Sequence, residues 1–252
     1  MLLKASKILG KENVRNGFFG QEINLTTYNL CRINMFLHDI GYDKFNIACE
    51  DTLVSPQHWD DEPFEVIVSN PPYSIKWAGD DNAVLINDPR YSPAGVLAPK
   101  SKADFAFIMH SLAWLATNGT ASIVCFPGIL YRGGAEQKIR KYLIDNNFVD
   151  CIIQLPENLF YGTSIATCIM VLKKSKKDNS TLFIDATKEC IKVTNNNRLS
   201  EENINNIINV FTNRENIEFV SKLVSNKEID EIVNREQILR DEINKIISEI
   251  EV

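Results

Sequence analysis

A short apolar run that stops at two prolines constrains this chain more than any other stretch. Residues Phe64 to Val68 are mostly apolar and β-branched, and Pro63 precedes them, which is typical of a buried β-strand. The run ends at Asn70-Pro71-Pro72-Tyr73. Each proline fixes its own φ and pushes the residue before it out of the helical region. The chain is therefore expected to leave the strand as a rigid, extended turn.

This tetrapeptide carries groups suited to act on an amine attached to a base. The Asn70 side-chain carbonyl and the Pro71 backbone carbonyl are both acceptors. Two acceptors aimed at the hydrogens of an exocyclic amine draw its nitrogen towards tetrahedral geometry and free the lone pair for attack. Tyr73 offers a ring on which an extruded base can stack. The alternative is a plain turn, because Asn-Pro pairs commonly begin turns.

Asn70-Pro71-Pro72-Tyr73 resembles the catalytic motif of methyltransferases that act on the amino groups of nucleobases, chiefly adenine-N6 DNA methyltransferases. The resemblance implies catalytic roles for Asn70, Pro71, Pro72 and Tyr73, and a contact of Asn70 with the cofactor.

Length, charge and cysteine spacing restrict the remaining possibilities. A chain of 252 residues can form one sizeable domain and a small one. The formal net charge of −6 argues against strong nonspecific nucleic-acid binding, so another chain is expected to supply most of the grip on DNA. The six cysteines show no C-x-x-C pair and no zinc spacing, so we predict no metal and a reducing compartment. No apolar run approaches a membrane span and no signal pattern is visible, which predicts a cytoplasmic protein without membrane contact.

Two more strands are predicted before Phe64, and an acidic side chain follows each of them. The strand Phe18–Gly20 closes on Glu22, and the strand 45–49 closes on Asp51, with a helix expected over residues 23–40 between them. In an open parallel α/β sheet, ligands bind at the carboxyl ends of strands. One carboxylate can accept from both ribose hydroxyls of a nucleoside, and the next can hold an adenine amine. The alternative is that both acids are helix N-caps.

Several further motifs make the resemblance more specific. The chain resembles the modification (M) subunit of type I restriction–modification systems over most of residues 2 to about 190. The matching stretches are Gly20-Gln21-Glu22-Ile23-Asn24, Asn34-Met35-Phe36-Leu37-His38, Asp51-Thr52-Leu53, Ser69-Asn70-Pro71-Pro72-Tyr73, Asp104-Phe105-Ala106-Phe107, Phe126-Pro127-Gly128, Arg132-Gly133-Gly134-Ala135-Glu136 and Leu155-Pro156.

This resemblance implies an adenine-N6 DNA methyltransferase that uses S-adenosyl-L-methionine and works with a specificity subunit and a restriction subunit on double-stranded DNA with a flipped adenine. Glu22 matches the ribose-binding acid, and Asp51 with Thr52 matches the adenine-binding stretch. The implied fold is a Rossmann-like α/β methyltransferase sheet that lacks its first strand, over residues 1–190, followed by a helical assembly tail over residues 191–252.

The middle of the chain offers further candidates beside the site. Residues 74–100 form a long polar loop in which Trp77 or Tyr91 could stack on a base, although a solvent-facing or partner-facing aromatic is an equal alternative. Apolar spacing predicts a helix over residues 101–118 and then a strand over 121–126. Glycines at 133 and 134 open a helix and could cradle a phosphate, with Arg132 on a DNA backbone. A flexible connection is the alternative.

Two more strands are expected over residues 148–155 and 165–172. Their joining loop, with Phe160, Tyr161 and Gly162, is a candidate wall for the base pocket. The resemblance implies that this pair ends the sheet with an antiparallel strand.

The last sixty residues change in character. Leu199-Ser200-Glu201-Glu202 indicates a capped helix that runs to about residue 212. From Lys227 the chain is strongly charged and carries an apolar stripe that only Glu236 interrupts: Ile229, Ile232, Leu239, Ile243, Ile246 and Ile250. One helix cannot bury such a stripe alone. Packing on the domain is one alternative, and pairing with a helix of the specificity subunit is the expectation.

One motif of the resembled family is missing. The strand followed by Asp-Pro-x-x-Gly-Ser-Gly, which wraps the methionine end of the cofactor, is expected just before Leu2, and neither it nor the N-terminal helical domain is present. The isolated chain is therefore expected to bind S-adenosylmethionine weakly or not at all, and the neighbours of the missing strand to expose apolar flanks. Two alternatives remain open: a truncated, inactive M-subunit fragment that keeps only assembly contacts, and a methyltransferase for RNA or protein glutamine.

Overall fold

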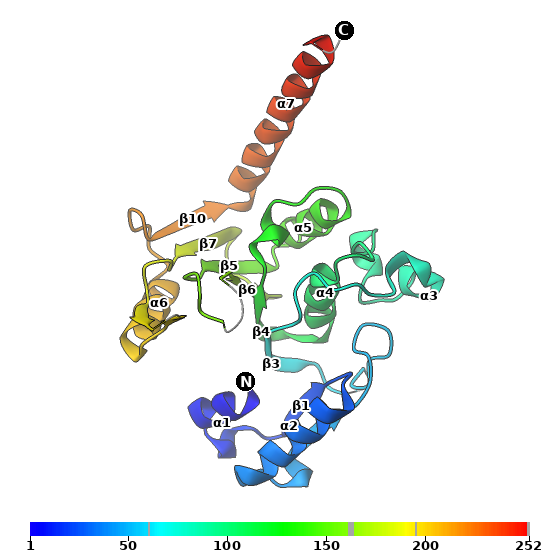
Figure 1. Cartoon of the computed structure of the whole chain (residues 1–252), viewed down its shortest axis with the longest axis vertical. Helices are drawn as coiled ribbons and strands as arrows, with labels where there is room; N and C mark the ends of the chain where they lie inside the picture. Colours follow the sequence, from blue (N-terminus) through cyan, green and yellow to red (C-terminus); the bar gives the residue numbers. More distant parts are fainter. Residues whose placement is uncertain (60, 161–163, 195, 251–252) are drawn as a thin grey trace. The chain divides into compact units, whose positions relative to one another are not determined.

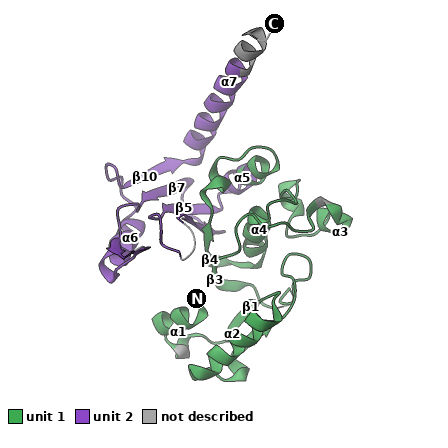
Figure 2. Ribbon diagram, in the orientation of Figure 1, with its two compact units in different colours: residues 1–140 green, residues 141–252 purple. Residues whose placement is uncertain are grey.

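The computed structural model of the chain describes residues 1–59, 61–160, 164–194 and 196–250, without the side chains of residues 11, 80 and 244–250. Contacts divide the chain into two compact units, residues 1–140 and 141–252, drawn in green and purple in Figure 2. The domain boundary predicted between residues 190 and 191 stays a prediction.

The first unit alternates strands and helices, which confirms the expected α/β character. Its helices and strands are α1 (Leu2–Leu9), β1 (Phe18–Gln21), α2 (Leu25–Leu37), β2 (Phe45–Ala48), β3 (Phe64–Ser69), α3 (Ala83–Ile86), α4 (Asp104–Trp114), β4 (Leu115–Cys125) and the start of α5 (Ala135–Asp145) (Figure 1). Short 3₁₀ turns lie at Lys11–Asn13, Tyr42–Lys44, Gly79–Asp81, Ser92–Ala94 and Pro127–Leu130.

The strands β1 and β2 form a parallel pair in which Phe18 lies opposite Phe45. The helix between them, α2, begins at the N-cap Asn24. It buries Met35, which is 1% exposed, in a small core with Phe18. Because the strands are parallel and adjacent, the residues that follow them emerge at the same edge of the pair.

The strands β3 and β4 form a second parallel pair. Among the described residues β3 pairs with β4 alone, and Val66 on β3 is 55% exposed, as expected where a sheet lacks a neighbouring strand. The predicted helix over residues 101–118 is wrong at its end, because α4 stops at Trp114 and β4 begins at once.

Contact with β3 explains why α4 ends early. Leu115 pairs with Phe64, and a Cβ atom placed on Gly119 would lie 2.8 Å from the Phe64 carbonyl oxygen. Residues 115–119 therefore lie against the start of β3, and this tertiary pairing overrides the helical spacing of their apolar side chains. The residues expected to be buried on the helix are buried, among them Phe105 at 0% and Leu112 at 4% exposure.

The second unit contains a mixed sheet. Its elements after α5 are β5 (Val149–Gln154), β6 (Cys168–Lys173), β7 (Ser180–Asp185), β8 (Ile191–Val193), β9 (Asn196–Arg198), α6 (Glu201–Asn213), β10 (Ser221–Ser225) and α7 (Asn226–Ile250). Strand β5 pairs with β6 antiparallel and with β7 parallel, and β10 pairs with β7 antiparallel. The antiparallel β6 is as expected. The expectation that the pair β5–β6 ends the sheet is wrong, because β7 and β10 continue it beyond β5.

A buried carboxylate joins three elements of this unit. Asp150 on β5 is 3% exposed and contacts Lys173 Nζ at 3.0 Å and Arg214 NH1 at 3.1 Å. Arg214 caps the end of α6, whose start carries the expected cap: Ser200 and Asn203 exchange the hydrogen bonds of a capping box. The ion pair between Arg214 and Asp150 therefore connects the end of α6 to β5 of the sheet.

The C-terminal helix α7 follows β10 directly and extends away from it in Figure 1. Ile229, at the start of its apolar stripe, is half-buried, and three later members of the stripe are exposed: Ile232 at 57%, Leu239 at 52% and Ile243 at 55%. Packing of the stripe on the second unit is therefore not what the structure shows for Ile232, Leu239 and Ile243. The segment 191–252 also holds β8, β9 and β10, so it is only partly helical.

Candidate active site

The tetrapeptide Asn70–Tyr73 follows β3 directly, as predicted. Asn70 is exposed, and the Tyr73 hydroxyl donates a hydrogen bond to its Oδ1 atom at 2.8 Å. The phenol therefore orients the amide of Asn70. A carbonyl oxygen has two lone pairs, so Oδ1 can accept a second hydrogen.

Buried charges hold the downstream end of this turn. Ser74 has a φ of 51°, an uncommon backbone conformation for a residue other than glycine. Its N–H donates to Asp104 Oδ1 at 3.2 Å, and its Oγ accepts from Arg132 NH2 at 3.2 Å. Asp104 stands at the start of α4 and is 6% exposed. The rigid turn expected from the two prolines is thus also anchored by tertiary contacts.

Arg132 belongs to this internal anchor. Its NH1 atom lies 3.6 Å from Asp104 Oδ2 and donates to Glu136 Oε1 at 3.3 Å, while its guanidinium lies 5.0 Å from the centre of the Phe126 ring. Burial raises the pKa of Glu136, against the opposing charge of Arg132. The suggested contact of Arg132 with a DNA backbone stays a prediction, and the structure gives this side chain a role inside the fold.

Glu22 and Asp51 follow the adjacent strands β1 and β2, at the edge where parallel strands place a ligand. Glu22 Oε1 accepts from the Asn24 N–H at 2.8 Å, and Asp51 Oδ1 accepts from the Leu53 N–H at 2.8 Å. The N-cap of α2 is Asn24, and the described residues directly after Asp51 form a turn, so neither acid is itself a helix N-cap. Each half-buried carboxylate accepts one hydrogen bond from a backbone N–H and can accept further ones from a hydroxyl or an amine.

A buried arginine that the sequence did not single out holds the turn after β2. Arg90 is 2% exposed and donates from NH1 to the Thr52 carbonyl and from NH2 to the Leu53 carbonyl, both at 2.8 Å. Its Nε and NH2 atoms also grip Asp88, at 2.7 Å for the shortest contact. Burial alone would raise the pKa of Asp88, and the hydrogen bonds and charge of Arg90 outweigh it, so this pKa lies below its ordinary value. The only sequence feature that could have indicated this ion pair is Asp88-Pro89-Arg90, which places the two charges two residues apart in a stretch expected to be a polar loop.

The last N–H group of Arg90 is directed at a histidine on α4. Arg90 NH1 lies 3.0 Å from His110 Nδ1. Arginine only donates, so Nδ1 is the acceptor and the ring is neutral. Burial and then the charge of Arg90 lower the pKa of His110 to about 3.

The aromatic candidates of residues 74–100 lie inside this assembly. The Tyr91 side chain is 3% exposed and its hydroxyl donates to the Leu53 carbonyl at 2.9 Å, so it is not placed to stack on a base. Trp77 donates from Nε1 to the Pro99 carbonyl at 3.1 Å and packs edge-on against the Tyr91 ring. The long segment is therefore an ordered bridge. This bridge begins directly after the tetrapeptide and, through Arg90 and Tyr91, binds the turn after β2.

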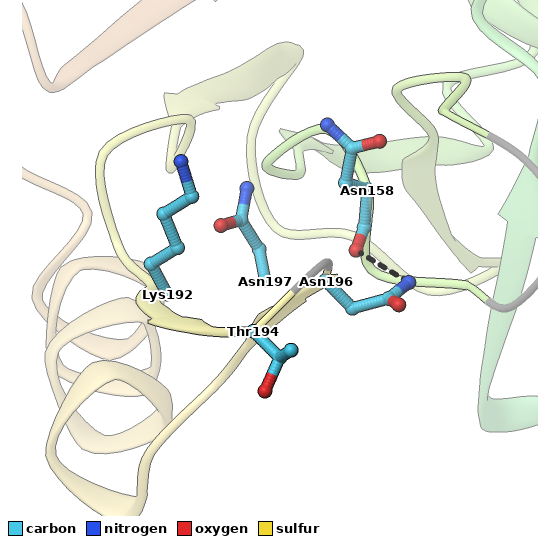
Figure 3. A pocket seen from close by; sticks show the side chains of 5 residues that line it. All are labelled: Asn158, Lys192, Thr194, Asn196 and Asn197. Carbon is cyan, nitrogen blue, oxygen red and sulfur yellow. Dashed lines mark hydrogen bonds between the residues drawn. The ribbon is translucent and has the colours of Figure 1, made fainter.

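A separate pocket of about 340 Å³ lies in the second unit and is shown in Figure 3. It is lined by polar side chains: Asn158, Lys192, Thr194, Asn196 and Asn197. Two of its amides form hydrogen bonds with the backbone of the loop after β5: Asn196 Nδ2 donates to the Asn158 carbonyl at 3.4 Å, and Asn197 Nδ2 donates to the Glu157 carbonyl at 2.9 Å. The pocket joins the β8–β9 hairpin to the loop after β5 and holds no group of the predicted chemistry. Of the base-pocket wall suggested in that loop, Tyr161 and Gly162 lie outside the described residues.

The described residues offer neither a metal site nor a membrane-spanning helix. They contain no cluster of histidine, cysteine, aspartate and glutamate that could hold a metal ion. No helix in the described part of the chain combines the length and the apolar character needed to cross a membrane.

Comparisons with known proteins converge on one family. A family model described as N-6 DNA Methylase matches residues 1–244. The type I restriction enzyme MpnII methylase subunit of Mycoplasma pneumoniae is 47% identical over 293 residues, which cover 100% of this chain and 54% of that protein. The MjaVII methylase subunit of Methanocaldococcus jannaschii is 34% identical over 223 residues, with 84% of this chain and 38% of that protein covered.

A solved structure agrees. The type I restriction–modification methyltransferase subunit from Streptococcus thermophilus superposes with a TM-score of 0.87 at 40% identity, covering 91% of this chain and 49% of that one. The chain thus spans about half the length, or less, of the relatives it matches.

Proposed function

Because the chain belongs to the N-6 DNA methylase family, we propose that it provides the substrate half of the active site of an adenine-N6 DNA methyltransferase in a type I restriction–modification system. The observation that carries this proposal is the exposed Asn70 amide at the end of β3, oriented by Tyr73 and backed by a turn anchored on buried charges. These groups can accept both hydrogens of an adenine amine without a general base.

The proposal gives each residue of the tetrapeptide a task. Asn70 Oδ1 accepts one amine hydrogen and the Pro71 carbonyl accepts the other, while Pro72 keeps that carbonyl in place. Tyr73 orients the Asn70 amide through its hydroxyl and presents its ring to a base flipped out of the duplex.

The residues at the ends of β1 and β2 fit the nucleoside part of S-adenosylmethionine. Glu22 would accept from the ribose hydroxyls and Asp51 from the adenine amine, with Thr52 beside it, since both carboxylates have acceptor capacity left. When bound, this cofactor supplies a methyl group on a positively charged sulfur. Residues 1–252 contain no Gly-x-Gly loop for the methionine end. We therefore expect calorimetry on this chain alone to show no micromolar affinity for S-adenosylmethionine, and such an affinity would contradict the assignment of a half-site.

The test of the reaction uses the assembled methylase complex. Asn70→Ala should lower methyl transfer to DNA by about 100-fold or more, because one of two acceptors for the amine is lost, while far-UV circular dichroism stays unchanged. Asn29→Ala, an exposed asparagine on α2, is the matched control and should keep full activity. Methyl transfer retained in Asn70→Ala would remove Asn70 from the reaction, and transfer to RNA in place of DNA would favour the alternative substrate.

We also propose that α7 pairs with a helix of the specificity subunit. The exposed stripe of Ile232, Leu239 and Ile243 runs along a helix of 25 residues and needs an apolar partner. The double variant Ile232→Asp and Ile243→Asp should abolish co-purification with the specificity subunit and leave the folded chain intact. Glu231→Gln on the same helix is the control, and copurification of the double variant at the unchanged level would exclude this surface.

A further inference from the structure

The segment after the tetrapeptide reaches back to the turn after β2, and one side chain makes most of that connection. Arg90 uses all five N–H groups of its guanidinium: two carbonyls of residues 52 and 53, two bonds to Asp88 and one to His110. Arg90 is only 2% exposed, and a buried cation is tolerated only where its donors are satisfied. Each of these partners is therefore needed to keep the guanidinium in place.

The two carbonyls that Arg90 binds belong to the residues next to Asp51. Within the same turn, Asp51 accepts from the Leu53 N–H through its side chain and from the Ser55 N–H through its backbone carbonyl, at 2.8 and 2.9 Å. Arg90 and Asp51 therefore bind the peptide unit between residues 52 and 53 from opposite sides, because the C=O and N–H of a trans peptide point in opposite directions. If the guanidinium is lost, the Thr52 carbonyl loses this donor and the Leu53 carbonyl keeps only the Tyr91 hydroxyl, so the turn that directs the Asp51 carboxylate is held less firmly.

We propose that Arg90 is a positioning residue that sets the Asp51 carboxylate for the cofactor and ties it, through residues 74–100, to the turn that carries Asn70. This inference rests on the proposed function. Asp88 and the neutral His110 orient the guanidinium, and Tyr91 supports the same Leu53 carbonyl. Lysine cannot replace arginine here, because its three donors radiate from one atom and cannot reach two carbonyls and two side chains together.

The test compares two arginines that each clamp a pair of backbone carbonyls in the first unit. Arg90→Lys is the test variant. Arg140→Lys is the matched control, because Arg140 NH1 binds the carbonyls of Ile129 and Arg132 at 2.9 and 3.0 Å, away from the turn at Asp51. Both variants are introduced into an intact methylase subunit that carries the loop for the methionine end of the cofactor, and they are examined in the assembled complex. Hydrogen exchange is followed at residues 51–55, binding of S-adenosylhomocysteine by calorimetry, and methyl transfer for KM and kcat.

Arg90→Lys should speed exchange at residues 51–55 and weaken S-adenosylhomocysteine binding by about tenfold or more, the effect of losing one hydrogen bond from a charged group. The KM for the cofactor should rise similarly, while kcat at saturation changes less than about threefold, since only binding is lost. Arg140→Lys should leave exchange and affinity at the turn unchanged. Unchanged exchange in Arg90→Lys, or equal effects in both variants, overturns the proposal.

A milder variant keeps the inference testable if Arg90→Lys does not fold. Asp88→Asn keeps the acceptor for the Arg90 backbone N–H and weakens the grip on the guanidinium, so affinity should fall by a smaller factor in the same direction. Faster exchange at residues 51–55 with unchanged ligand affinity would keep Arg90 as the clamp but remove Asp51 from the cofactor site, which is a failure of the proposed function and not of the clamp.

Discussion

Acid should loosen the first unit through one buried ring, His110. This side chain is 6% exposed, its Nδ1 accepts from Arg90, and it stays neutral in the folded chain down to a pKa of about 3. In the unfolded chain the same ring takes up a proton near its ordinary pKa of about 6.5. Between these values the unfolded state binds more protons, so stability is fully present above about pH 6.5 and is lost as the pH falls.

The size of this effect follows from the two pKa values. Protonation of the unfolded ring alone lowers the free energy of unfolding by about 2 kcal/mol between pH 7 and pH 5, from a folded pKa of about 3. Little screening reduces it, because the ring is enclosed by α4, Arg90 and Trp114, whose ring centre lies 4.0 Å away. Asp88 opposes the shift only partly, and His58 adds to it.

The assay is urea unfolding followed by tryptophan fluorescence at pH 7, 6 and 5. All three tryptophans lie in residues 1–140, so the signal reports the first unit. The variant His110→Asn keeps an acceptor near Nδ1 but cannot titrate, so its stability should fall about 2 kcal/mol less than that of the parent chain between pH 7 and pH 5. His38→Asn removes an exposed histidine and should behave as the parent chain does. Parallel pH profiles for parent and His110→Asn would refute the reasoning.

Three further predictions concern stability. Asp150→Asn should lower the free energy of unfolding in urea by about 2 kcal/mol, which is less than for a fully buried pair, because Lys173 and Arg214 are partly exposed. Glu236→Gln, in a surface ion pair, should lower it by under about 1 kcal/mol. Equal losses in the two variants would contradict this account. Phe105→Ala should cost about 3 to 5 kcal/mol, since the ring is 0% exposed, and a loss below about 1 kcal/mol would argue against a packed core there. Ser200→Ala should cost about 1 kcal/mol and Ser200→Gly less, measured by thermal unfolding, with the order reversed if the cap is not formed.

Local patterns in the sequence were sufficient for most of the elements. The apolar runs before Glu22, Asp51 and Asn70 are strands, because short β-branched and aromatic stretches bounded by turn residues have few other ways to be buried. The cap at Ser200 marks the start of a helix because it acts within one turn. The tetrapeptide could be predicted as a candidate site for the same reason: proline geometry and amide chemistry belong to the residues themselves.

The structure was needed wherever distant segments meet. Residues 115–118 have helical spacing but form a strand, because β3 offers them hydrogen bonds that no local rule represents. Arg90 stands in a polar stretch, and only the folded chain shows its guanidinium closed around the carbonyls of residues 52 and 53, nearly forty positions earlier. The sequence by itself thus determined which groups are candidates for the chemistry. The tertiary structure decided what holds them, because a buried charge is stable only where segments far apart in the chain supply every partner at once.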